Sequence, residues 1–231
     1  GLYQLNDTAV FALLSRVYLY KGDWAKCISS ATEALGPQPN LPSIANFPAL
    51  WKDGETNGNR APALGVYFKV RNTKADNVNT PGVNYYQPVS GELKSEYVVS
   101  YELSQLFEAN DVRTSTYIYR APFQGNQYNH VVKYGGRASA ITGLDPTGQN
   151  PAGVVDGKVI RVAEVLLNRA EAYYRSSPSN PAAALADLKK LKTNGYTGYD
   201  PTSDDGLAGQ ALLDEILLQR RLELAFEGDG F

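Results

Sequence analysis

The chain has 231 residues, which is enough to bury a substantial core in one large or two small domains. Its 22 basic and 24 acidic residues give a formal net charge of −2, so no positive excess favours nucleic acid as a partner. A single cysteine, Cys27, and a single histidine, His130, exclude a disulfide framework and a cysteine-rich or histidine-rich metal site, and we expect neither metal nor cofactor.

Residues 7–36 are predicted to form a tetratricopeptide-like helical hairpin. Apolar residues recur at helical spacing from Ala9 to Tyr20, and a second apolar stripe begins at Trp24, which we expect in the core. Gly22-Asp23 separates the two stripes, and Asp23 is the expected N-cap of the second helix. Cys27 lies on the second stripe and is expected to be a small buried apolar side chain.

Residues 37–158 are predicted to form an irregular, aromatic-rich layer. Long irregular stretches in a compact protein are usually functional or disordered, and the many aromatic residues argue against disorder. The elements expected here are a strand at Leu64–Val70, a long loop at Asn72–Val89 with a Pro81-Gly82 turn, a short helix at Ser100–Ala109, a strand at Thr114–Tyr119 and a loop at Arg137–Gly157.

Helical periodicity returns in residues 159–192, which are predicted to form a second helical hairpin whose second helix starts at Pro181. A closing helix is expected within residues 207–228, from about Gln210 to Glu227, and it is apolar on two sides. The expected fold class is therefore mainly α, with tetratricopeptide-like hairpins and a long loop-rich insertion that carries short strands. We expect residues 1–231 to form a single domain.

Four segments carry a set of motifs in a fixed order. They are Ala12–Trp24, Phe107–Arg113 with the pattern F-x-x-x-D-x-R, Val159–Tyr174 with R-x-A-E-x-x-L-x-x-A-E-A, and Ile216–Gly228, close to I-x-x-E-R-R-x-E-L-A-F-E-G. This ordered set resembles the SusD/RagB family. Three departures from the family pattern are Gln219 in place of Glu, Asp229-Gly230 in place of a His/Arg-aromatic pair, and the end of the second hairpin at Lys190–Gly195.

The resemblance implies a non-catalytic lipoprotein on the extracellular face of the outer membrane of Bacteroidetes-type bacteria. Family members pass captured oligosaccharide, or in some cases peptide, to a SusC-like TonB-dependent transporter. They are about twice the length of this chain, which corresponds to their carboxy-terminal portion. Membrane attachment is therefore expected only through a lipid anchor outside this chain.

Charged residues lie on helices that are otherwise apolar, and two interpretations are open. They could be paired carboxylates for acid–base chemistry, or ion pairs that join the repeat helices to the irregular layer, which we favour. The residues are Arg161, Glu164, Arg169, Glu171, Arg220, Arg221, Glu223 and Glu227. In the loop Asp200–Gly206 the oxygen donors could suit calcium, but Asp204 or Asp205 is better explained as the N-cap of the last helix.

Tyrosines are the candidate ligand-binding residues, because a flat apolar ring beside amide groups suits the apolar face and polar rim of a sugar. The candidates are Asn84, Tyr85, Tyr86 and Gln87 in the longest loop, and Tyr128 with Asn129. Each ring could instead pack the irregular layer onto the helices. Trp51 is expected in the core, and His130 is expected to be a structural histidine.

Three functions remain open at this point. The first is binding of an oligosaccharide or polysaccharide for uptake, without catalysis. The second is a tetratricopeptide-like scaffold for protein–protein interaction, since such surfaces commonly bind peptides or proteins. The third, ranked last, is a glycoside hydrolase, which needs two suitably placed carboxylates.

Overall fold

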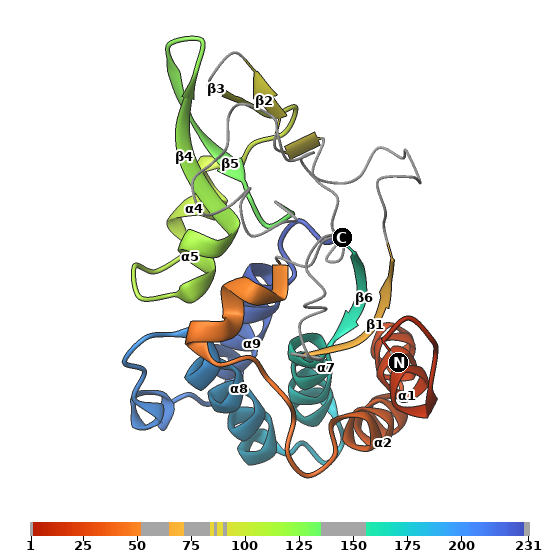
Figure 1. Cartoon of the computed structure of the whole chain (residues 1–231). Coiled ribbons are helices and arrows are strands. Elements are labelled where there is room, and N and C mark those ends of the chain that lie inside the picture. Colours follow the sequence, from red (N-terminus) through yellow and green to blue (C-terminus); the bar gives the residue numbers. More distant parts are fainter. Residues whose placement is uncertain are drawn as a thin grey trace. The chain divides into compact units, whose positions relative to one another are not determined.

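The computed structural model describes residues 2–51, 65–71, 84–85, 92–134 and 156–228, together with the backbone of 87–89 (Figure 1). The chain divides into two compact units. Unit 1 comprises Gly1–Ser43, Ala63–Lys69 and Lys158–Phe231, and unit 2 comprises Ile44–Pro62 and Val70–Gly157. The expectation of a single domain stays a prediction. In the described ranges, every helix is too short or too polar to cross a bilayer.

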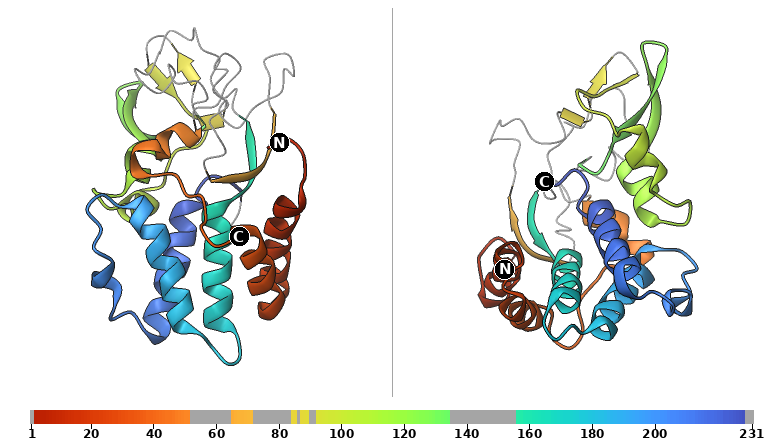
Figure 2. Two further views of the ribbon diagram at one scale, coloured as in Figure 1. Left: turned by 60° about the horizontal axis from the view of Figure 1, so that its bottom comes forward. Right: turned by 180° about the vertical axis from the view of Figure 1, so that it is seen from behind.

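Unit 1 is built from helices that lie side by side (Figure 2). Helix α2 packs against both α1 and α7, and α7 also packs against α8 and α9. Their bounds are Asp7–Lys21 for α1, Trp24–Leu35 for α2, Val162–Arg175 for α7, Pro181–Gly195 for α8 and Gly209–Glu223 for α9. The mainly α class and the two predicted helical hairpins are confirmed.

Local capping explains where the first hairpin turns. Asn6 accepts a hydrogen bond from the backbone N–H of Ala9 at the start of α1, and α1 ends at Gly22, whose φ of 68° lies in the left-handed region. Asp23 then accepts from the N–H of Lys26 at 3.2 Å. The predicted N-cap is confirmed.

The core of unit 1 lies along both sides of α7. One cluster joins Ala12 of α1 and Ala31 of α2 to Leu166, and another joins Leu167 to Leu188 of α8 and Ile216 of α9. Small alanines let the helix axes approach closely, while the leucines and isoleucine fill the space between them. Cys27 is fully buried, which raises the pKa of its thiol to about 12, and the predicted apolar role is confirmed.

A short two-stranded sheet adjoins these helices. Strand β1, Val66–Val70, confirms the strand predicted at Leu64–Val70 and pairs with β6, Gly157–Arg161. Strand β6 runs directly into α7, so the sheet fixes the start of that helix. The N–H of Val162 donates to the carbonyl of Gly65 at 2.8 Å.

Unit 2 contains short elements around an aromatic core. They are the 3₁₀ helix η1 at Ile44–Trp51, strands β2 at Gln87–Val89 and β3 at Glu92–Lys94, helices α4 at Tyr101–Gln105 and α5 at Val112–Tyr117, and strands β4 at Ile118–Phe123 and β5 at Asn126–Val131. β2 pairs antiparallel with β3, and β4 with β5. The β4–β5 turn has positive φ at Gln124 and Gly125, as a tight hairpin requires. Trp51 is 1% exposed, so its predicted core position is confirmed.

The strand predicted at Thr114–Tyr119 is wrong, because most of that segment is the helix α5. Asp111 accepts from the backbone N–H of Arg113 at 2.8 Å and starts the helix. The hydroxyl of Thr116 donates to the carbonyl of Val112 at 2.7 Å, which a helical turn allows. The alternation of β-branched residues suggested a strand, but the cap decides the local structure, and the strand begins only at Ile118.

Two predicted loops are longer than the structure allows. The Asn72–Val89 segment ends in strand β2, and the Arg137–Gly157 segment ends at Gly157, the first residue of β6. β2 forms a tight antiparallel pair with the adjacent β3, whereas β6 pairs with β1, which is distant in sequence. The local pattern does not reveal either pairing. The Pro81-Gly82 turn lies outside the described residues.

The predicted cap of the last helix is also wrong. Helix α9 begins after Ala208, which makes no side-chain cap. Asp204 instead accepts from the Tyr199 hydroxyl at 2.6 Å and pairs with Lys192 at 2.8 Å, because the 3₁₀ turn η3, Pro201–Asp204, ends the loop before the helix starts. Asp200 caps that turn by accepting from the N–H of Thr202.

Candidate functional site

The backbone around residue 84 is held against the segment that follows β3. The carbonyl oxygen of Asn84 accepts from the N–H groups of Glu96, at 2.9 Å, and Tyr97, at 3.3 Å. The carbonyl oxygen of Tyr85 accepts from the Ser95 hydroxyl. These bonds tie together residues that are 10 to 13 positions apart, and they place the rings of Tyr85 and Tyr97 next to each other.

Four aromatic rings form a chain of contacts from the core of unit 2 to its surface. Trp51 meets Tyr134 edge-on, with centroids 6.1 Å apart, and Tyr134 is nearly parallel to Tyr85 at 6.0 Å and 19°. Tyr85 in turn meets Tyr97 at 6.4 Å. Exposure rises along the chain, from 1% at Trp51 and 9% at Tyr134 to 65% at Tyr97. A buried anchor therefore supports an accessible ring.

Polar groups surround the exposed end of this chain. Asn84 is exposed beside Tyr85, and Glu96 pairs with Lys94 at 2.6 Å while both side chains remain partly exposed. Burial of the Tyr85 phenol raises its pKa, so the ring stays neutral. We call Asn84, Tyr85, Glu96 and Tyr97 the tyrosine platform. It offers an apolar ring face next to amide and carboxylate groups, which is the combination that a sugar needs.

The sequence-based candidates are only partly brought together. Asn84 and Tyr85 belong to the platform, whereas Tyr86 and the side chain of Gln87 lie outside the described residues. Tyr128 and Asn129 are neighbours on β5 and point to opposite faces of the hairpin. Tyr128 is linked to the platform indirectly, because its ring meets His130 edge-on at 6.1 Å, and His130 contacts Ser95 at 2.7 Å. Their role in binding stays a prediction.

Sequence reasoning missed Tyr97 and Tyr134. Neither stands beside amide residues, the pattern that marks Tyr85 and Tyr128. Tyr134 is 49 positions from Tyr85 in sequence, and only the fold shows that their rings stack. The sequence signal for these two residues is the high tyrosine content of residues 37–158. It indicates that an aromatic cluster forms there, but it does not identify which tyrosines belong to the cluster.

His130 is buried beneath the platform and confirms the structural histidine that the sequence predicted. Its Nε2 lies 3.2 Å from the carbonyl oxygen of Ala121, which can only accept, so Nε2 carries a proton. Its Nδ1 lies 2.7 Å from the Ser95 hydroxyl, whose single proton is shared between Nδ1 and the Tyr85 carbonyl. Burial lowers the pKa of His130, and the bond to Ala121 offsets part of that effect.

We expect the His130 ring to titrate below its ordinary pKa of about 6.5. The unfolded chain would then bind a proton at a higher pH than the folded chain, so stability falls as pH drops through about 6.5. Since this is the only histidine in the sequence, one ring signal in an NMR pH titration gives the result directly. A midpoint at or above 6.5 would contradict the buried, neutral ring.

Charged residues of the helical motifs are ion-paired within unit 1. Arg16 donates to both carboxylate oxygens of Glu164, at 2.5 and 2.6 Å, and Arg169 does the same to Asp187, at 2.7 and 2.8 Å. Arg161 binds Glu223 and Glu227. These contacts support the structural interpretation over acid–base chemistry. The pairs named here join elements of unit 1 to one another, and the expectation that such pairs also reach the irregular layer stays a prediction.

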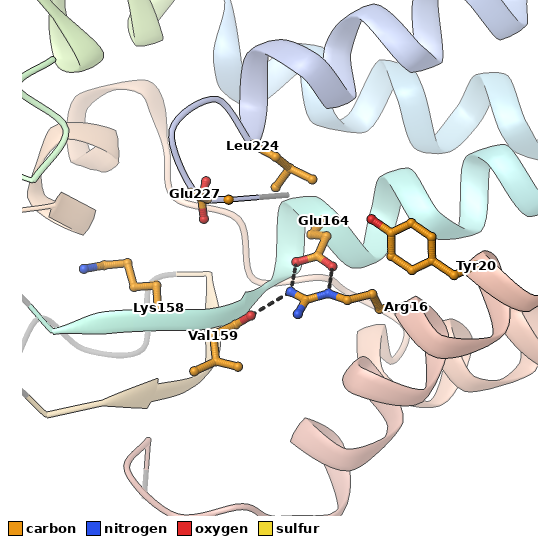
Figure 3. Close-up of a pocket in the computed structure, with 8 residues that line it drawn as sticks. Arg16, Tyr20, Lys158, Val159, Glu164, Leu224 and Glu227 are labelled. Atoms are coloured by element: carbon orange, nitrogen blue, oxygen red, sulfur yellow. Dashed lines mark hydrogen bonds and ion pairs between the residues drawn. The ribbon is translucent and has the colours of Figure 1, made fainter. Parts of the chain in front are cut away.

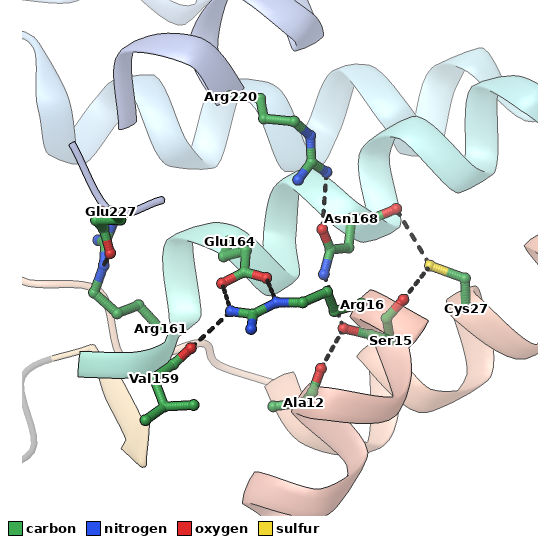
Figure 4. A network of polar contacts seen from close by, with 10 residues as sticks. All are labelled: Ala12, Ser15, Arg16, Cys27, Val159, Arg161, Glu164, Asn168, Arg220 and Glu227. Atoms are coloured by element: carbon green, nitrogen blue, oxygen red, sulfur yellow. Dashed lines mark hydrogen bonds and ion pairs between the residues drawn. The ribbon is translucent and has the colours of Figure 1, made fainter. Parts of the chain in front are cut away.

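A polar network next to these pairs connects three helices (Figure 4). Asn168 of α7 donates to the Ser15 hydroxyl of α1 at 3.0 Å and accepts from Arg220 of α9 at 2.8 Å. Asn168 and Ser15 are fully buried, so hydrogen bonding offsets the cost of removing them from water. The motif residues therefore hold the helices in register.

The carboxylates of the Asp200–Gly206 loop also have protein partners. Asp204 binds Lys192 and Tyr199, and Asp205 pairs with Lys189. Among the residues that the structure describes, acidic, histidine and cysteine side chains form no group of three that could hold a metal ion. The loop acts as a local ion-paired turn.

Comparison with known proteins defines the class. The sequence model of the SusD family matches residues 55–231, and the chain belongs to this family. No curated protein sequence matches the chain.

Solved structures show the same fold. A SusD superfamily protein from Bacteroides thetaiotaomicron has a TM-score of 0.72 and 22% identity, and the match covers 99% of this chain and 49% of that one. A SusD-like carbohydrate binding protein from Bacteroides vulgatus has a TM-score of 0.69 and 21% identity, with 99% and 44% covered. The surface glycan-binding protein A of Bacteroides uniformis has a TM-score of 0.64 and 21% identity, with 99% and 49% covered. The chain spans about half of the length of these structures.

Proposed function

We propose that the protein binds an oligosaccharide or polysaccharide at the tyrosine platform and delivers it to a SusC-like TonB-dependent transporter. It acts on the extracellular face of the outer membrane and is held there by a lipid anchor. Membership of the SusD family supports the proposal, as do the names of two structural relatives, a carbohydrate binding protein and a surface glycan-binding protein.

The graded chain of rings is the observation that carries the binding site. Tyr97 is 65% exposed, yet Tyr85 and the buried Tyr134 support it from below. A ring fixed in this way loses little freedom when a ligand stacks on it. Shallow aromatic sites of this kind give dissociation constants from about 1 μM to 1 mM, or about −8 to −4 kcal/mol.

Replacing Tyr97 with alanine is expected to weaken glycan binding about tenfold, which equals about 1.4 kcal/mol. The substitution removes the accessible ring while the protein stays folded, because most of that ring is in solvent. Isothermal titration calorimetry against a panel of plant and host polysaccharides measures the effect.

Tyr101→Ala is the matched control. Tyr101 is a tyrosine of the same unit and is 73% exposed, but within the described ranges its ring contacts no other aromatic ring. Its removal should leave the affinity unchanged. Equal losses in both variants, or none in Tyr97→Ala, would contradict the proposed platform.

Delivery and catalysis are tested separately. Co-purification from outer membranes should recover a TonB-dependent transporter with the protein, and incubation with the bound glycan should release no new reducing ends. Recovery of the transporter by a protein that binds no glycan would favour the interaction-scaffold alternative, and new reducing ends would favour a hydrolase.

A further inference from the structure

A cavity of about 380 Å³ lies within unit 1 (Figure 3). Arg16 and Tyr20 of α1, Lys158 of β6, Glu164 of α7 and Glu227 line it. We propose that this cavity is a second carbohydrate site, which takes a neutral mono- or disaccharide. The proposal goes beyond glycan capture at the tyrosine platform, because it uses residues of unit 1 alone.

The wall of the cavity is fixed before any ligand arrives. Arg16 donates to Glu164 through Nε and Nη2, at 2.5 and 2.6 Å, and Nη2 also donates to the carbonyl of Val159 at 2.7 Å. The Glu164 side chain is only 3% exposed. Two parallel hydrogen bonds and a third to a carbonyl fix the plane of the Arg16 guanidinium. The side chain therefore loses little conformational entropy when a ligand binds, and its polar atoms are preorganised.

The charge of the lining selects the class of ligand. Among the lining residues, the cations are Arg16 and Lys158 and the carboxylates are Glu164 and Glu227. Arg161, which also binds Glu227, is offset by its second partner, Glu223, so the charges remain balanced. A phosphate or a nucleotide needs a positive excess, and an amine needs a negative one. A sugar hydroxyl donates and accepts at once, and it can therefore bond with guanidinium, ammonium and carboxylate groups alike. Balanced charges in one cavity favour a neutral polyhydroxyl ligand.

Tyr20 supplies the apolar surface that a sugar ring requires. It lies beside the Arg16–Glu164 pair in Figure 3, and it is 65% exposed. An aromatic face next to charged hydrogen-bonding groups matches the two sides of a pyranose ring. The volume sets the size of the ligand, because it is near the lower limit of the roughly 300–1,000 Å³ typical of small-molecule sites.

The test is an NMR titration of the purified, ¹⁵N-labelled protein with glucose, maltose, cellobiose and N-acetylglucosamine, with glucuronic acid as a charged comparison. We expect at least one neutral sugar to cause saturable shifts at Tyr20 and Lys158. Tyr20→Ala should weaken that binding at least tenfold, and Tyr20→Phe, which keeps the ring, should retain most of it. Tyr101→Ala, in unit 2, should have no effect.

The outcomes separate this site from the tyrosine platform. Loss of the Lys158 shifts in Tyr20→Ala, with polysaccharide binding still sensitive to Tyr97→Ala, supports two sites. An absence of saturable shifts at Tyr20 with every sugar, or unchanged binding in Tyr20→Ala, overturns the proposal while leaving the platform untouched. Tighter binding of glucuronic acid than of glucose overturns the inference of a neutral ligand.

Discussion

Replacing Arg161 with alanine is expected to lower the free energy of unfolding by about 3–5 kcal/mol. Arg161 is 2% exposed, and its guanidinium donates to Glu223 at 2.6 Å and to Glu227 at 2.5 and 3.0 Å. It also donates to the backbone carbonyl of Glu223 at 3.0 Å. The alanine variant would remove the positive partner of two largely buried carboxylates, which is much more costly than losing a surface pair.

Urea denaturation followed by circular dichroism measures this loss. The control is Arg221→Ala, which removes an exposed arginine from helix α9 and should change the free energy by no more than about 0.5 kcal/mol. Arg161→Lys should recover only part of the stability, because an ammonium group cannot form the forked contacts. A loss below about 1 kcal/mol in Arg161→Ala would show that the ion pair does not hold β6 to the end of α9.

The second large effect is expected from Trp51→Ala, which should cost about 3–5 kcal/mol of unfolding free energy in unit 2. Trp51 meets the rings of Tyr117, at 5.6 Å, and Tyr134, at 6.1 Å, and the ammonium of Lys133 lies 4.4 Å from its ring centroid. Alanine leaves a cavity at the base of the ring chain. Tyr134 then loses its support, and Tyr85 and Tyr97 lose theirs in turn.

This variant should therefore reduce glycan affinity although Trp51 is 1% exposed and cannot touch the ligand. Calorimetry at a temperature where the variant stays folded measures the affinity, and urea denaturation measures the stability. Trp51→Phe, which keeps an aromatic ring in the core, should restore most of both. A large stability loss with unchanged affinity would contradict the idea that the core positions the platform.

Helices were predictable from the sequence because their apolar spacing is local. The apolar stripe from Ala9 to Tyr20 predicts α1. The Gly22-Asp23 break predicts the end of α1 and the N-cap of α2, and all three predictions are confirmed. The errors have a common physical origin. At Thr114 the side chain of Asp111 caps a helix where the residue pattern predicts a strand. At Asp204 a short 3₁₀ turn, capped by Asp200, occupies the residues that were expected to start the last helix.

The candidate site was predictable only in part. Asn84 and Tyr85 were identified because amides flank aromatic rings there. Tyr97 lies next to them through backbone bonds to Asn84, and Tyr134 stacks on Tyr85 from a distant segment. Such contacts between distant segments leave no local trace in one sequence. The motif charges show the same limit, since Arg16 and Glu164 are 148 positions apart and their pairing follows only from the packing of α1 against α7.

Glycan binding at the tyrosine platform is tested most directly by NMR of protein with isotope-labelled tyrosine rings, titrated with the polysaccharide that calorimetry identifies. We predict that the ring signals of Tyr85 and Tyr97 shift together and saturate at the calorimetric affinity, while the signal of Tyr101 stays in place. Saturable binding that leaves the Tyr85 and Tyr97 signals unmoved would contradict the platform as the glycan-binding site.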